Sequence, residues 1–132
     1  MSAARTRELV ELTMSAEKIR DAMISIAFVG KAAIAALNKN YLSHSGPTDV
    51  ISFGFAAVAG RTDVVGDIYI SPDVARRNAT AHHAPVREEL LRLVVHGVLH
   101  VLGYEHPDGE QRYISPMWRR QELLLQRALV AA

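Results

Sequence analysis

The chain contains no cysteine. This absence excludes disulfide bonds, thiolate-ligated zinc and a thiol nucleophile, and it suits a reducing compartment. No apolar run is as long as a membrane span, and the N-terminus continues into an amphipathic pattern instead of the apolar block of a signal peptide. We therefore expect a cytoplasmic protein that does not bind a membrane.

Neither sign of charge dominates, because 15 Lys and Arg residues face 14 Asp and Glu residues, for a net charge of +1. This balance argues neither for nor against a nucleic-acid partner. Repeats, low-complexity tracts and linker-like segments are also lacking. At 132 residues we expect one domain, residues 1–132, that is large enough to form a stable core. The composition does not determine the oligomeric state.

Hydrophobic periodicity and capping residues predict five helices and three strands. Two of the helices begin with Ser-Pro, which combines an N-cap with proline at the first helical position. The predicted helices cover residues 4–18, 31–41, 72–81, 85–102 and 116–129, the strands cover 23–29, 48–55 and 64–70, and a hairpin-type connection covers 59–63. This order indicates an α/β (α+β) fold, with a small mixed sheet of three to four strands packed by about five helices.

The long helix that begins at Pro85 is apolar almost all round, so we expect it to be central and buried. It carries His96 and His100, which are four residues apart and therefore lie on one face. Gly103 offers the left-handed conformation that ends a helix, so the chain can fold back and bring in His106.

Three imidazoles with an open fourth position are typical of a catalytic zinc site, whereas structural sites have four protein ligands. For His96 and His100 alone, hydrogen-bonded core histidines are an equal alternative. The turn that delivers His106 favours the metal. We therefore predict one Zn²⁺ at His96, His100 and His106, which nickel or a similar ion could replace in a purified sample.

The histidine spacing also matches the metzincin motif H-E-x-x-H-x-x-G-x-x-H, but Gly97 stands where that motif has its general-base glutamate. Glycine inside a helix costs about 1 kcal/mol relative to alanine, so it usually marks a close approach of backbone or ligand. Tight packing of the helix on a strand explains Gly97 equally well. A metalloprotease-like hydrolase is therefore the least favoured alternative.

Three sequence blocks resemble the YbeY family, the metal-dependent rRNA-maturation endoribonucleases of bacteria. Residues 47–53 (P-T-D-V-I-S-F) resemble the family's P-T-[DN]-V-L-S-F, and residues 65–68 (V-G-D-I) resemble its L-G-D-I. Residues 96–106 (H-G-V-L-H-V-L-G-Y-E-H) resemble its H-G-x-L-H-L-x-G-Y-D-H. The order and approximate spacing agree from about Ile24 to the C-terminus. Gly97, which disagrees with the metzincin motif, is normal in this family.

The resemblance implies a zinc-dependent, single-strand-specific endoribonuclease that acts in late ribosome assembly and quality control. Its implied substrate is the 3′ end of 16S rRNA, and its implied partner is the small ribosomal subunit. Carried over by position, the metal ligands are His96, His100 and His106. The family fold, a mixed sheet with helices around it and the metal in a cleft, is similar to the one predicted above.

Two positions depart from the family pattern. Leu42 follows Tyr41 where the family has an arginine that lines the cleft and is implicated in activity. Leucine cannot bind a phosphate, and the nearby Lys39 and His44 are displaced in sequence. A weakly active or non-catalytic metal-binding ribosome-assembly factor is therefore the main alternative function. Glu105 replaces an aspartate and keeps its charge, so we expect it to be tolerated.

The expected reaction is the attack of a metal-activated water on an RNA phosphodiester. Because Gly97 supplies no base, Glu105 and Asp67 are candidates for handling the proton, although each is equally explained as a helix-end or turn charge. Asp67 or Asp49 could instead orient a ligand imidazole. Tyr104 could stack on a base, but packing beneath the turn is favoured. A solvated surface is the favoured role for the basic residues Arg76, Arg77, His82, His83, Arg87, Arg92, Arg119 and Arg120.

Overall fold

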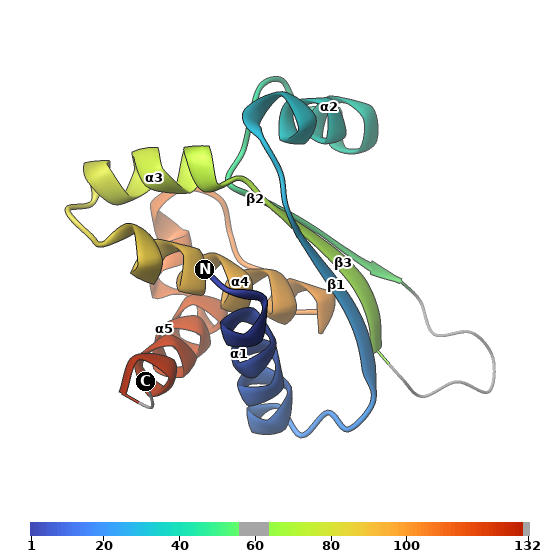
Figure 1. The fold of residues 1–132 in the computed structure, drawn as a ribbon, viewed down its shortest axis with the longest axis vertical. Helices are drawn as coiled ribbons and strands as arrows, with labels where there is room; N and C mark the ends of the chain where they lie inside the picture. The colour runs from blue at the N-terminus through green and yellow to red at the C-terminus, as the bar shows by residue number, and fades with distance from the viewer. Residues whose placement is uncertain (56–63, 131–132) are drawn as a thin grey trace.

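The computed structural model describes residues 1–55 and 64–130, and its chain path is shown in Figure 1. All five predicted helices and three predicted strands are present, with ends that differ by at most a few residues, and the short 3₁₀ helix η1 was not predicted. The elements are α1 (Ala3–Ala16), β1 (Ala22–Phe28), α2 (Lys31–Leu42), β2 (Val50–Phe55), β3 (Val64–Ile70), α3 (Pro72–Ala81), α4 (Val86–Val101), η1 (Gly109–Ile114) and α5 (Pro116–Val130).

The predicted fold class is confirmed, because the three strands form one mixed sheet in the order β1-β3-β2. The central strand β3 is parallel to β1 and antiparallel to β2. The predicted connection over residues 59–63 lies outside the described residues. Among the residues that the structure describes, no helix is both long enough and apolar enough to cross a membrane.

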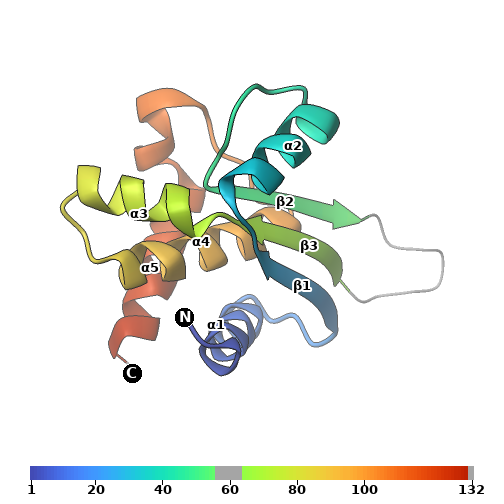
Figure 2. The ribbon, with the colours of Figure 1, turned by 45° about the horizontal axis from the view of Figure 1, so that its top comes forward.

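Helix α4 lies at the centre of the structure, as predicted. It packs against α1, α3, α5 and the strands β2 and β3, and Figure 2 shows it near the middle of the ribbon, beside the sheet, with α2 lying apart from it. Its apolar side chains are almost fully buried, including Leu91, Val94, Val95, Val98 and Leu99. Burying such a side chain stabilises a fold by about 1.5–3 kcal/mol, so this helix is a firmly held support for the residues that it carries.

Glycine permits α4 to approach the sheet closely at two points. A Cβ on Gly97 would lie 2.7 Å from Cγ2 of Ile68, and a Cβ on Gly66 would lie 2.5 Å from Cγ1 of Val101. The packing explanation of Gly97 is therefore confirmed. A glutamate at position 97 would be directed at the sheet, which explains physically why the metzincin base is missing from this helix.

Replacing Gly97 with alanine should destabilise the protein by up to about 2 kcal/mol. The added methyl group meets Ile68, and overpacking of this kind typically costs about 1–3 kcal/mol, against a gain of about 1 kcal/mol in helix propensity. Urea unfolding measures the difference. In an Ile68→Ala background the same change should cost less, because the contacting atoms are gone. An equal cost in both backgrounds would show that Ile68 is not the obstacle.

Candidate metal centre

The end of α4 brings the three histidines together. Gly103 has φ +102°, and its N–H donates to the carbonyl of His100 at 3.0 Å. The N–H of Tyr104 donates to the carbonyl of Leu99, also at 3.0 Å. These two bonds form a Schellman motif, which ends the helix and reverses the chain. The predicted turn is therefore confirmed, and it returns His106 towards the face that carries His96 and His100.

The three imidazole rings form a compact cluster. The ring centroids of His96 and His100 lie 4.6 Å apart, and that of His106 lies 5.2 Å and 5.1 Å from them. One ligating atom from each ring lies within 4.8 Å of the others. Nitrogens around a tetrahedral zinc are about 3.4 Å apart, given Zn–N distances of about 2.0–2.1 Å, so the cluster could hold a metal ion after a small contraction.

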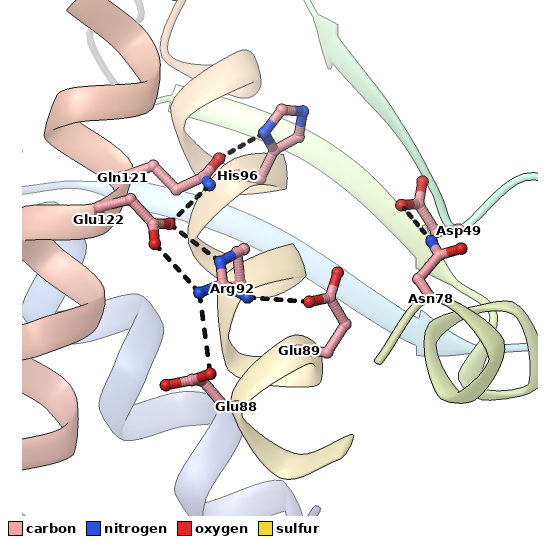
Figure 3. Close-up of polar contacts among 8 residues, drawn as sticks. All are labelled: Asp49, Asn78, Glu88, Glu89, Arg92, His96, Gln121 and Glu122. Carbon is pink, nitrogen blue, oxygen red and sulfur yellow. Dashed lines mark hydrogen bonds and ion pairs between the residues drawn. The ribbon is translucent and has the colours of Figure 1, made fainter. Parts of the chain in front are cut away.

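Each imidazole is also oriented by an oxygen at its Nδ1 atom. His100 Nδ1 lies 2.9 Å from the carbonyl oxygen of Tyr104, and His106 Nδ1 lies 2.9 Å from that of Pro107. His96 Nδ1 lies 2.6 Å from Oε1 of Gln121, as Figure 3 shows. An oxygen that accepts a hydrogen bond places the proton on Nδ1 and leaves the lone pair of Nε2 free. This donor set fits a metal ion, because ligating histidines usually carry such a partner.

The surroundings keep two of these imidazoles neutral, which is the form that binds metals. Burial lowers the pKa of His96 from 6.5 to about 4, and the positive charge of Arg112 also lowers it, whereas the hydrogen bond to Gln121 opposes the shift. Burial likewise lowers the pKa of His100. His96 and His100 are therefore ready to bind a cation without first losing a proton at neutral pH.

The cluster lines an open cleft of about 520 Å³, which we call the histidine cleft. Its walls include Leu42 from the end of α2, Ser52 from β2, Glu105, and Arg112 from η1. An adjoining pocket of about 920 Å³ shares His96, Asp49 and Arg112 with it. Within the described parts of the chain no fourth His, Cys, Asp or Glu joins the cluster, so the donor set matches the open, three-ligand type of site.

The carboxylates proposed from the sequence are not all in this cleft. Glu105 lines it and is exposed. Asp67 pairs with Phe53 across the sheet and lies on the face opposite Ile68, whose side chain contacts α4. It therefore faces away from the histidines. Asp49 lines the cleft, but its carboxylate accepts hydrogen bonds from Asn78 and the N–H of Val50 and none from an imidazole.

Two of the basic residues expected on a solvated surface are instead partly buried in ion pairs. Arg92 binds Glu89 and Glu122, and its side chain is only 17% exposed. Arg120 binds Glu17, which also accepts a hydrogen bond of 2.5 Å from the hydroxyl of Tyr104. That expectation was wrong for both arginines, and Tyr104 packs under the turn as favoured. The residues that are exposed as expected are Arg76, Arg77, His82, His83, Arg87 and Arg119.

Comparison with known proteins identifies the family. The family model described as "Endoribonuclease YbeY" matches residues 2–128. The chain belongs to the YbeY family. An "Endoribonuclease YbeY" from Syntrophus aciditrophicus is 37% identical over 123 residues, which cover 89% of this chain and 76% of that protein. One from Chloroherpeton thalassium is 32% identical over 127 residues, with coverages of 89% and 88%.

A solved structure shows the same fold. The solution structure of a Thermotoga maritima protein superposes with a TM-score of 0.66 at 25% identity, and the match covers 98% of this chain and 85% of that one. In the present YbeY-family fold, two of the sequence blocks that carried the resemblance line the histidine cleft, and the third supports it. Residues 48–52 form a wall of the cleft, residues 96–106 supply the three histidines, and residues 65–68 contact α4 through Gly66 and Ile68.

Sequence reasoning missed two residues of this site, Gln121 and Arg112. Gln121 is 25 positions from the His96 that it contacts, so no local spacing could reveal the pair. Arg112 lies in the unpredicted η1, donates to the carbonyl of Gly109 and makes no ion pair among the described residues. Its position after the third histidine was the only available signal.

In the metal-free protein, His96 should stay neutral until the pH approaches 4. An unfolded histidine titrates near 6.5, so between these values the unfolded state binds the proton first, and the free energy of unfolding should fall as the pH decreases from about 6.5 to about 4. NMR titration of the His96 ring gives the midpoint directly, and urea unfolding over the same range gives the stability. A midpoint near 6.5 would contradict the burial of this ring.

Proposed function

We propose that this protein is a zinc-dependent endoribonuclease that cleaves single-stranded RNA during late ribosome assembly. The proposed substrate is the 3′ end of 16S rRNA on the small ribosomal subunit, in the cytoplasm. The observation that carries the proposal is the cluster of His96, His100 and His106 in an open cleft, with every Nδ1 bound to an oxygen. The relatives named Endoribonuclease YbeY support RNA as the substrate.

Each part of the centre has a proposed task. His96, His100 and His106 hold the zinc ion through Nε2, and the histidine cleft admits the RNA backbone. A cation held there would lower the pKa of a bound water towards about 7 and would offset negative charge on a phosphoryl oxygen. Glu105, exposed in the same cleft, is the remaining candidate for moving the proton. Asp67 is not carried forward, since it lies on the other face of the sheet.

Arg112 is the proposed phosphate contact. It lines both the histidine cleft and the adjoining pocket, and its guanidinium has no carboxylate partner among the described residues. Arginine is suited to this role because its planar fork binds phosphate oxygens in pairs. The positive charge of the cleft is therefore supplied by Arg112 on η1. The resemblance led us to expect an arginine at position 42, where Leu42 lines the same cleft without a charge.

The uncharged Leu42 also favours a second function. A protein that binds metal and rRNA but cleaves slowly or not at all would act as a ribosome-assembly factor. The two functions predict the same RNA binding and the same metal content, and they differ only in turnover.

Cleavage of single-stranded RNA by the zinc-loaded protein should stop when His100 is replaced by alanine. We expect a loss of at least about 100-fold, since removing a ligand costs more than the 10–100-fold typical of its supporting partners. His44→Ala is the matched control, because His44 lines the cleft outside the cluster. Residual cleavage that is equal in wild type and His100→Ala would remove the enzymatic proposal. Metal and RNA binding without any cleavage would select the assembly factor.

Arg112→Gln should weaken RNA binding and leave the zinc content unchanged. Losing one phosphate contact on a single strand should reduce the slope of log K against log salt by about 0.7. Arg119→Gln is the matched control, because this exposed arginine lies outside both pockets. Fluorescence anisotropy with a labelled single-stranded RNA at several salt concentrations gives the slopes. Identical slopes for wild type and Arg112→Gln would exclude Arg112 as a phosphate contact.

A further inference from the structure

The His96 ligand differs from the other two in the kind of group that orients it. His100 and His106 face backbone carbonyls, which can only accept a hydrogen bond. His96 faces the side-chain amide of Gln121, which is 1% exposed. An amide turned by 180° would present its NH₂ group to Nδ1 and leave the imidazole proton on Nε2, where it blocks a metal ion. The orientation of Gln121 therefore decides whether His96 can act as a ligand.

A neighbouring carboxylate determines that orientation. Gln121 Nε2 donates to Glu122 Oε2 at 3.0 Å, as Figure 3 shows. An ionised carboxylate has no proton to donate, so the amide must turn its NH₂ group towards Glu122. The amide oxygen is then directed at His96, 2.6 Å from Nδ1.

The carboxylate is itself held by an arginine on the same helix as His96. Arg92 donates to both oxygens of Glu122, from Nε and Nη2, each at 3.0 Å. Its Nη1 atom donates to Glu89 at 2.9 Å, and Glu89 is 4% exposed. All the partners of Glu122 in this network are therefore N–H donors, so the geometry requires a carboxylate that accepts at both oxygens.

We propose that Glu122, held by Arg92, is a positioning residue that orients the Gln121 amide and thereby places the His96 proton on Nδ1. The four side chains form a relay that runs Arg92–Glu122–Gln121–His96 and leaves His96 Nε2 free for the metal. The inference rests on the proposed metal centre, but its first consequence is the tautomer of His96, which can be observed without any metal.

The test is to replace Glu122 with glutamine, which removes the carboxylate and retains the shape. The new amide has one acceptor oxygen in place of two, so it cannot accept at both positions that receive N–H groups from Arg92 and Gln121. Where it turns its NH₂ group towards Gln121, that amide turns its own NH₂ group towards His96. In the metal-free protein, ¹⁵N NMR of the imidazoles should report Nδ1–H at His96 in wild type and Nε2–H or a mixture in Glu122→Gln. Zinc affinity, measured by competition with a chelator, should fall by about 10–100-fold.

Exchanging the two residues provides the rescue. In Gln121→Glu/Glu122→Gln the carboxylate lies next to His96 and accepts from Nδ1–H, so the wild-type tautomer and most of the zinc affinity should return at pH 8. His100 is the internal control, because its carbonyl partner is unchanged in every variant. Glu8→Gln is the matched control, since Glu8 is an exposed partner of Arg5 far from the cluster in sequence.

The outcomes separate this inference from the proposed function. A wild-type tautomer and unchanged zinc affinity both in Glu122→Gln and in Glu122→Leu, which has no acceptor for the Gln121 amide, would overturn the relay. Loss of affinity that the exchanged variant does not restore would also overturn it, because that result indicates a general structural effect. If His96 shows the expected tautomers and the wild-type protein binds no zinc, the relay stands and the metal centre fails.

Discussion

The structure depends on the close packing of helix α4 against the sheet. Gly97 over Ile68 and Val101 over Gly66 bring helix and strand nearer than any larger residue at the glycine positions would allow. With its apolar side chains buried on all sides, α4 cannot rotate without losing several of these contacts at once. The packing of α4 therefore determines the directions in which His96 and His100 point. Because these residues lie on a helix held by the core, the site is rigid as well.

Polar groups around the cluster then set the chemical state of the ligands. Burial favours neutral imidazoles, and an oxygen at every Nδ1 directs the free lone pair to Nε2. Two of these oxygens belong to the turn that follows α4, and the third belongs to α5. The same turn that delivers His106 therefore also orients His100, while His96 depends on a helix packed against α4 from another part of the chain.

Much of this could be predicted from the sequence because the signals are local. Periodicity located the helices and strands, and the i, i+4 pair followed by Gly103 located the histidine cluster. Contacts across the fold could not be predicted, as with Gln121 at His96 and the ion pair between Arg92 and Glu122. The position of Asp67 was predictable in principle, since strand alternation places it opposite its inward neighbours Gly66 and Ile68. The short helix η1 has no periodic signal, and Arg112 was missed with it.

The central claim is that one metal ion is bound by the imidazoles of His96, His100 and His106 with an open fourth position. X-ray absorption spectroscopy of the zinc-loaded protein tests it most directly. The account predicts about four light ligands near 2.0–2.1 Å, with the outer-shell scattering of three imidazoles, one of which is lost in His106→Ala. Scattering from fewer than three imidazoles, or a wild-type spectrum in His106→Ala, would contradict it.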